Sequence, residues 1–102
     1  MAAKAYQHPD LKNVSFSQVM QALSDPCRIS IMQALIREQE LACNELPSDV
    51  AKATLSHHVG VLRDAGLITT RVEGTKCLNS VRHEAFNDYF PGLLNLIQNS
   101  HH

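Results

Sequence analysis

Three cysteines and six histidines are the side chains in this sequence that could carry thiol or metal chemistry. Cys27 falls in the first turn of a predicted helix, directly before Arg28. A helix N-terminus and a neighbouring cation both stabilise a thiolate relative to a thiol. Cys43 and Cys77 are further thiols, although a free cysteine often behaves as a small buried apolar side chain. Cys27, Cys43 and Cys77 are therefore candidate redox residues, with Cys27 the first of them.

Enzyme chemistry finds little support in the sequence. There is no glycine-rich phosphate loop and no G-x-S-x-G motif. His57 and His58 are adjacent, so their rings point to different faces of a helix and do not form a metal-binding pair. The sequence therefore predicts a protein that is not an enzyme.

A second chemistry is hydrogen bonding from a polar helix face over residues 52–65. Leu55, Val59 and Leu62 have the spacing of one buried face. The opposite face carries small and polar residues and is flanked by Ser56 and Val61; its members are Ala53, His57, Gly60 and Asp64. Because small residues let another surface approach the backbone, this face is suited to contact a partner.

A basic hairpin follows that helix. After Gly66 the apolar residues recur every second position, and Gly74 supplies a turn with positive φ. Arg71, Thr75 and Lys76 lie near its tip. Residues 51–82 carry five basic and two acidic groups, so the middle of the chain is electropositive although the whole chain has a net charge of -1.

The other elements are predicted to be mainly helical. Ser15 and Gln18 form a capping-box pattern that starts a short first helix, and a second helix runs over 26–38. Residues 39–50 are interpreted as a short strand or a third helix limited by Pro47. Residues 83–99 form an amphipathic helix with a break at 91–92. All five aromatic residues lie outside 17–85, so the two ends are expected to pack together or against a second copy.

Length and composition indicate one globular domain. The 102 residues suit a single domain, and 44% hydrophobic content is ordinary for a folded chain. No apolar run reaches the roughly 18 residues that span a membrane, and we expect no signal peptide. Three cysteines cannot all pair within one chain, so a cytoplasmic protein with reduced thiols is expected.

Three sequence segments carry a family resemblance. The stretch ATLSHHVGVLRDAGLI (53–68) closely resembles the recognition helix of ArsR/SmtB-type bacterial transcriptional repressors. ALSDPCR (22–28) is similar to the entry to the second helix of that family, and VEGTK (72–76) to its wing turn. The resemblance implies a winged helix-turn-helix fold, mainly α with a small β-hairpin wing, in the order α-α-(short strand)-α-α-β-β-α.

The resemblance also implies a homodimer that binds an inverted repeat in double-stranded DNA. Within the single domain 1–102, residues 44–82 would form the helix-turn-helix and wing, 15–24 and 83–99 the dimerisation helices, and 1–14 a partly flexible arm. The implied DNA-binding residues are Lys52, Ala53, Thr54, Ser56, His57, Arg63, Arg71, Thr75 and Lys76. The implied dimer interface comprises Phe16, Val19, Phe86, Tyr89, Phe90, Leu93, Leu94 and Ile97.

The metal-binding patterns of that family are incomplete here. Its thiolate site has two cysteines in a Cys-x-Cys spacing, whereas ELACNEL (40–46) holds Cys43 alone. Its other site places a histidine two residues after an aspartate, whereas Phe90 follows Asp88 at that spacing. We therefore expect no metal site and no cofactor.

The predicted recognition helix also departs from the family at two positions. Lys52 and Ala53 stand where Gln and Ser are common in the family, which implies a different operator sequence.

The resulting hypothesis is a repressor that releases its operator on a signal, with thiol oxidation the first candidate. A metal-responsive repressor with an atypical site and a winged-helix protein-interaction module remain as alternatives.

Overall fold

Helices and a small antiparallel sheet alternate along the chain in the computed structural model, which describes residues 6–101. The fold is mainly α with a β-hairpin, as predicted. The elements are a 3₁₀ turn (Leu11–Asn13), α1 (Phe16–Ala22), α2 (Pro26–Glu38), β1 (Glu40–Ala42), a second 3₁₀ turn (Cys43–Glu45), α3 (Lys52–Asp64), β2 (Ile68–Glu73), β3 (Lys76–Val81), α4 (His83–Tyr89) and α5 (Leu93–Gln98).

Side-chain caps start the first two α-helices at the predicted positions. The Ser15 hydroxyl accepts from the Gln18 amide at 3.1 Å. The Asp25 carboxylate accepts from the amides of Cys27 and Arg28 at 2.8 and 3.2 Å. These bonds satisfy amides that have no partner within the helix. The start of α2 is therefore held by one carboxylate.

The predicted third helix before the recognition helix does not form between residues 39 and 51. The short strand β1 (Glu40–Ala42) forms there, as the sequence allowed, and only the 3₁₀ turn Cys43–Glu45 and the loop 46–51 follow it. Leu46 is extended, with φ −74° and ψ 143°, because a residue before proline disfavours the α region. The Ser48 hydroxyl then accepts from the Val50 amide at 3.1 Å, a local bond that competes with helix formation. The first helix of the helix-turn-helix is thus reduced to a single turn.

A buried asparagine joins the three strands, which are ordered β1-β3-β2 and all antiparallel. Asn79 on β3 is fully buried. Its Oδ1 accepts from the Thr70 hydroxyl on β2 at 2.8 Å, and its Nδ2 donates to the Leu41 carbonyl on β1 at 3.3 Å. Because both halves of the amide are satisfied, this polar group fixes the register of the sheet and costs little to bury.

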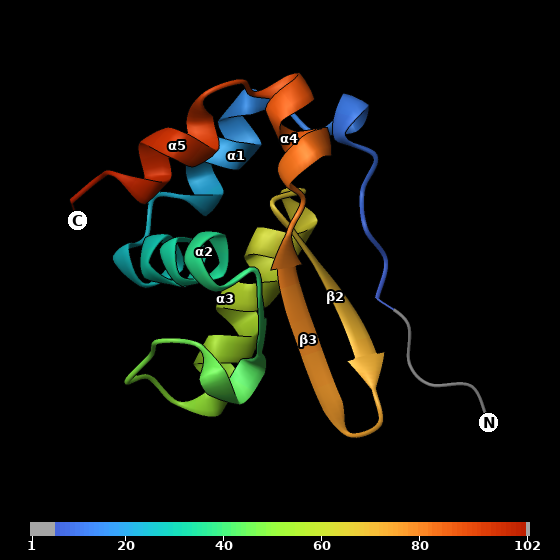
Figure 1. Ribbon diagram of the computed structural model, residues 1–102, viewed down its shortest axis with the longest axis vertical. Helices are drawn as coiled ribbons and strands as arrows, with labels where there is room; N and C mark the ends of the chain where they lie inside the picture. The colour runs from blue at the N-terminus through green and yellow to red at the C-terminus, as the bar shows by residue number, and fades with distance from the viewer. Residues whose placement is uncertain (1–5, 102) are drawn as a thin grey trace.

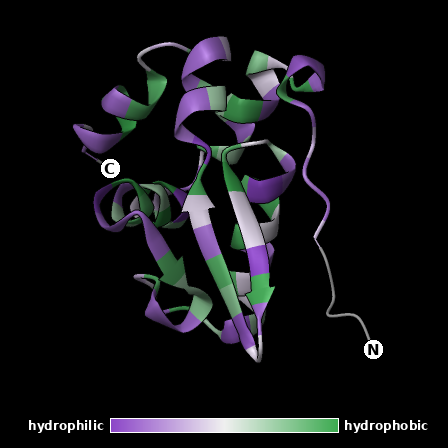
Figure 2. Cartoon of the chain, turned by 45° about the vertical axis from the view of Figure 1, so that its right-hand side comes forward, coloured by the Kyte–Doolittle hydropathy of each residue, from purple (hydrophilic) through white to green (hydrophobic). Residues whose placement is uncertain are grey.

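The helices lie in two groups about the sheet (Figure 1). Helices α1, α4 and α5 gather at one end, and the β2–β3 hairpin extends from them toward the other end, beside α2 and α3. The long strands change hydropathy along their length in Figure 2, as expected of strands with one buried face. The break predicted at 91–92 separates α4 from α5, with Gly92 at φ 86°. No described helix has the length and apolar content needed to cross a lipid bilayer.

Residues 6–14, within the expected arm 1–14, make specific contacts beside β2. The Thr70 amide donates to Nε2 of His8 at 2.9 Å, and Arg82 donates to the Pro9 carbonyl at 2.8 Å. Leu11 is only 2% exposed and lies over Gly66, where an added Cβ would stand 2.2 Å from the Leu11 Cδ2 atom. Residues 1–5 of that arm lie outside the described residues.

We predict that Gly66→Ala destabilises the fold more than Gly74→Ala. Both glycines have positive φ, at 80° and 63°, so each alanine costs roughly 1–2 kcal/mol in backbone strain. Only Gly66→Ala also displaces Leu11, which adds about 1–3 kcal/mol of overpacking. Urea unfolding of the two variants measures the difference. Equal free energies of unfolding would contradict the close approach of Leu11 to Gly66.

Candidate nucleic-acid interface

The helix α3 presents a polar outer face. Its inner face is held in the core, with Val59 and Leu62 buried and Leu55 partly buried against the core. The side chains at its N-terminal end that were predicted to contact DNA are all exposed, namely Lys52, Ala53, Thr54, Ser56 and His57. The apolar spacing therefore predicted correctly which face of α3 points outward.

The N-terminus of α3 is suited to bind an anion. Its N-cap residue, Ala51, offers no side chain to the first amides of the helix. Those amides and the helix dipole form a positive site that favours phosphate. Lys52 adds a full positive charge at the same end and is exposed. A DNA backbone is the kind of partner that such a helix end attracts.

The tip of the hairpin lies at the same end of the molecule as the start of α3. In Figure 1 both point away from the group formed by α1, α4 and α5. Gly74 and Thr75 form the two-residue turn between the paired residues Glu73 and Lys76. Thr75 and Lys76 are exposed, and within residues 6–101 no ion pair involves Lys76. The structure thus places the start of α3 and these two exposed wing residues at the same end of the molecule.

Arg71 forms ion pairs with two carboxylates. The charge count of residues 51–82 therefore overstates how much free positive charge this segment carries. Its guanidinium donates to both oxygens of Glu40, at 3.2 and 3.0 Å, and also to Glu73. These hydrogen bonds, with Glu40 the larger effect, raise the pKa of Arg71 above its usual value. Because Glu40 lies outside the electropositive segment 51–82, the sequence count missed this neutralisation. Arg71 is accordingly a weaker candidate for a phosphate contact than Lys76.

Arg63 is also engaged within the chain. Its guanidinium carbon lies 4.1 Å from the centre of the Tyr6 ring, and its Nη1 donates to the Thr70 hydroxyl at 3.4 Å. Arg63 is in the last turn of α3, away from the end that carries Lys52. The structure therefore does not group Arg63 with the other predicted contacts.

The end of the molecule formed by α1, α4 and α5 carries an apolar surface. The Phe16 and Phe90 rings are 6.2 Å apart, so the two ends of the chain pack together as predicted. Phe16, Tyr89 and Leu96 are 60%, 50% and 64% exposed. Sequence reasoning missed Leu96, because it lies off the apolar stripe of its helix.

Four of the residues expected at the dimer interface belong to the core of the protomer. They are Val19, Phe86, Leu94 and Ile97, all buried. Short helices on this end need an inner face of their own, and these residues supply it. The predicted interface is thus corrected to its outward-facing members.

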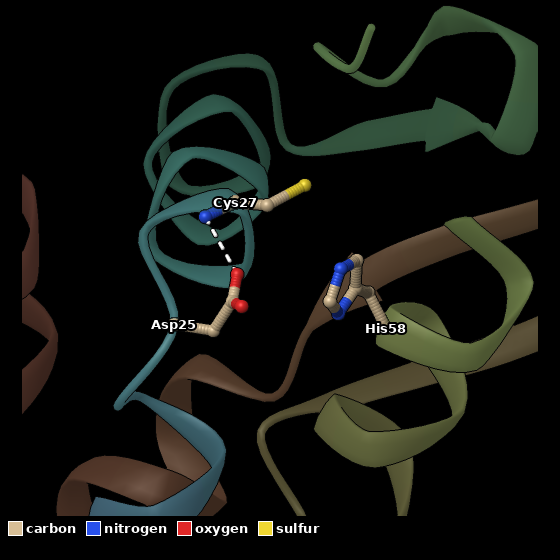
Figure 3. Close-up of side chains that lie close together, drawn as sticks. All are labelled: Asp25, Cys27 and His58. Atoms are coloured by element: carbon tan, nitrogen blue, oxygen red, sulfur yellow. Dashed lines mark hydrogen bonds between the residues drawn. The ribbon is translucent and has the colours of Figure 1, made fainter. Parts of the chain in front are cut away.

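The three predicted redox residues are free cysteines in different surroundings. Cys43 Sγ lies 3.4 Å from the Asn79 amide nitrogen, and Cys77 Sγ lies 3.6 Å from the Tyr6 hydroxyl. Cys27 lies beside Asp25 and His58, from a helix 31 residues further along the chain (Figure 3). No sequence signal pointed to this cluster, because His58 was not expected to face the start of α2.

His58 also links α3 to α2 through an arginine. Its side chain is buried, with 8% exposed, and its Nδ1 lies 3.0 Å from Nη1 of Arg28. Arg28 donates further to the Ala22 carbonyl at 2.6 Å. Since arginine can only donate, Nδ1 of His58 accepts this bond. The two adjacent histidines therefore differ: His58 is inward and bonded, and His57 is outward.

Comparisons with known proteins agree with this geometry. A family model described as a helix-turn-helix domain matches residues 23–71. The arsenical resistance operon repressor of Staphylococcus xylosus is 38% identical over 85 residues, covering 82% of this chain and 81% of the repressor. An uncharacterized HTH-type transcriptional regulator of Bacillus subtilis, YceK, is 37% identical, covering 76% of this chain and 81% of the relative. The chain belongs to the ArsR-type family of winged-helix regulators.

Solved structures of ArsR-type regulators share the fold. One ArsR family transcriptional regulator superposes with a TM-score of 0.66 at 28% identity, covering 78% of this chain and 89% of that one. Reduced HlyU from Vibrio cholerae gives a TM-score of 0.64 at 25% identity, with 79% and 82% covered. The ArsR-type family consists of DNA-binding transcriptional regulators rather than enzymes, as the sequence predicted.

We predict that His8 makes the stability of this ArsR-type chain depend on pH. Desolvation by burial, then the charges of Arg82 and Arg63, lower the pKa of His8 below its usual 6.5. The folded state therefore favours the neutral imidazole, which accepts from the Thr70 amide. This contribution is present above pH 6.5 and is lost as the pH falls through the lowered folded-state pKa.

An NMR titration of the histidine ring protons measures the pKa of His8 directly. Unfolding of the His8→Ala variant should show a smaller loss of stability on acidification than the unchanged chain. A folded-state pKa at or above 6.5 would contradict the assignment.

Proposed function

We propose that this chain is a cytoplasmic repressor in which α3 enters the major groove of DNA and the wing contacts the adjacent backbone. The observation that carries the proposal is the shared surface formed by the exposed N-terminal half of α3 and the tip of the hairpin (Figure 1). Ser56 and His57 would donate to or accept from base edges, and Lys52 and Lys76 would contact phosphates. The Staphylococcus xylosus relative is named a repressor, which supports the direction of regulation.

Salt dependence separates the two basic wing residues. We predict that Lys76→Ala lowers affinity for all DNA sequences alike and makes the slope of log K against log salt shallower by about 0.9 for each phosphate interaction that the substitution removes. Arg71→Ala should change that slope much less, because Glu40 and Glu73 already neutralise the guanidinium. Fluorescence anisotropy with a labelled duplex gives both slopes. A larger effect of Arg71→Ala than of Lys76→Ala would refute this assignment.

Sequence preference should depend on α3. A selection of bound duplexes from a random pool defines the operator of the unchanged protein. We predict that His57→Ala or Ser56→Ala relaxes its sequence preference, since each removes a group able to read bases, at a cost of about 1–3 kcal/mol for a good base contact. Lys76→Ala is the matched control that should keep the preference. If no DNA is enriched at all, the winged-helix protein-interaction module becomes the better interpretation.

We further propose that two protomers associate through the outward side chains of α1, α4 and α5. A shallow apolar depression there is lined by Phe16, Phe90, Leu93 and Leu96, with Pro91 and Gly92 between them. Exposed apolar patches of this kind commonly mark protein interfaces. A two-fold dimer would present two copies of α3, which fits an inverted repeat with half-sites roughly 34–36 Å apart.

The dimer makes a simple prediction. Leu96→Asp places a charge in the proposed interface and should give a monomer at micromolar concentration by sedimentation, with a native circular dichroism spectrum. Val50→Asp changes an exposed apolar residue in the loop before α3, outside the proposed interface, and should leave the dimer intact. A dimer that survives Leu96→Asp, or a monomeric unchanged protein, would exclude this interface.

Thiol oxidation as the releasing signal remains a prediction centred on Cys27. The half-buried thiol lies beside a carboxylate and an imidazole rather than at an uncapped helix end. Equal operator affinity of the reduced and the oxidised protein would remove thiol oxidation as the signal.

A further inference from the structure

A carboxylate, a thiol and an imidazole meet where the start of α2 faces the middle of α3 (Figure 3). They belong to Asp25, Cys27 and His58, and one potential ligand atom from each lies within 4.8 Å of the other two. Ligands of a tetrahedral Zn²⁺ ion, with Zn–S of about 2.3 Å and Zn–N or Zn–O of about 2.0–2.2 Å, lie roughly 3.3–3.7 Å apart. Side-chain rotations that close about 1–1.5 Å would complete a site with that geometry.

Asp25 can ligate a metal ion without leaving its helix cap. Both amide bonds of the cap go to Oδ1, so Oδ2 lies outside them. An aspartate carboxylate is ionised at neutral pH, as a metal ligand must be.

His58 has a lone pair that is held by a replaceable partner. Its Nδ1 accepts from Arg28 at 3.0 Å. Arg28 also donates to the carbonyls of Ala22, at 2.6 Å, and Gln21, at 3.5 Å. If a metal ion takes Nδ1, the guanidinium keeps these carbonyl partners. Metal binding at His58 thus costs one hydrogen bond and leaves no buried charge without a partner.

We propose that Asp25, Cys27 and His58 form a binding site for a divalent transition metal ion of the Zn²⁺ type, with water as the fourth ligand. A thiolate with an imidazole and a carboxylate selects such an ion over Mg²⁺ or Ca²⁺, which prefer oxygen ligands alone. On binding, the Cys27 thiol loses its proton to solvent. Two negative ligands then balance the charge of the ion in a partly buried place.

The consequence for regulation rests on the proposed DNA-binding function. His58 is adjacent to His57, which faces the proposed DNA surface, and the site would join α3 directly to the first turn of α2. The ion would replace the Arg28–His58 hydrogen bond by metal bonds and so change the contact that holds α3 against the start of α2. Operator affinity should fall when the site is filled.

Cobalt titration tests the site without DNA. The reduced 102-residue chain, with both His101 and His102 changed to alanine, is titrated with Co²⁺. The charge-transfer band of Co²⁺ reports a thiolate ligand, and its visible bands report tetrahedral coordination. We expect one Co²⁺ per protomer and loss of the charge-transfer band in Cys27→Ser. Asp25→Asn should weaken binding by at least about tenfold, since changes to residues that merely orient ligands already cost roughly 10–100-fold.

Asp25→Asn keeps the helix cap, because asparagine is as good an N-cap as aspartate, so it separates loss of a ligand from loss of fold. The matched controls are His57→Asn for His58→Asn and Cys77→Ser for Cys27→Ser, and both controls should bind Co²⁺ as the unchanged protein does. A charge-transfer band that survives Cys27→Ser, or unchanged affinity in both Asp25→Asn and His58→Asn, would overturn the site.

The DNA arm of the experiment is separate. Zn²⁺ should lower affinity for the selected operator in the unchanged protein and not in Cys27→Ser. Cobalt binding with unchanged operator affinity would overturn the regulatory role and support the site alone. Cobalt binding without any DNA binding would support the site and contradict the proposed function.

Discussion

The arrangement of the whole molecule depends on α3 burying one face only. Val59 and Leu62 fix that face in the core, so the first turns of α3 must point outward. The uncapped N-terminus of α3 and the exposed side chains of Ser56 and His57 then form a surface at the same end as the wing. Helix burial thus decides which residues of α3 are exposed and available to a partner. The electropositive segment 51–82 offers fewer basic groups to a partner than its charge count suggests, because Arg63 and Arg71 already have partners within the chain.

A second link connects α3 to α2 through polar groups. Asp25 caps α2, Arg28 in its first turn reaches the buried His58 on α3, and the Cys27 thiol lies close to Asp25 and His58. At this contact the proposed ion would replace a hydrogen bond at the same atom of His58. The proposed DNA surface and the proposed metal site therefore share one helix, and His58 is adjacent to His57.

Much of the fold could be predicted from the sequence because its signals are local. The caps at Ser15 and Asp25, the inner face of α3 and the turn at Gly74 each follow from spacing within a few residues, and the structure confirms them. The errors came from contacts across the chain or from competing local bonds. Because Leu46 precedes Pro47 and is extended, the helix expected in 39–50 is reduced to the 3₁₀ turn Cys43–Glu45.

Pairings between distant residues could not be predicted from the sequence. The Glu40–Arg71 pair and the cluster of Asp25 and Cys27 with His58 join residues about thirty positions apart. No hydrophobic periodicity in the sequence indicates such pairs.

The measurement that tests the proposed DNA surface most directly is an NMR map of backbone amide shifts on adding the selected operator duplex. We predict the largest shifts at 52–57 and 74–76. Shifts confined to the face around Phe16 and Leu96, with none in α3, would contradict that surface.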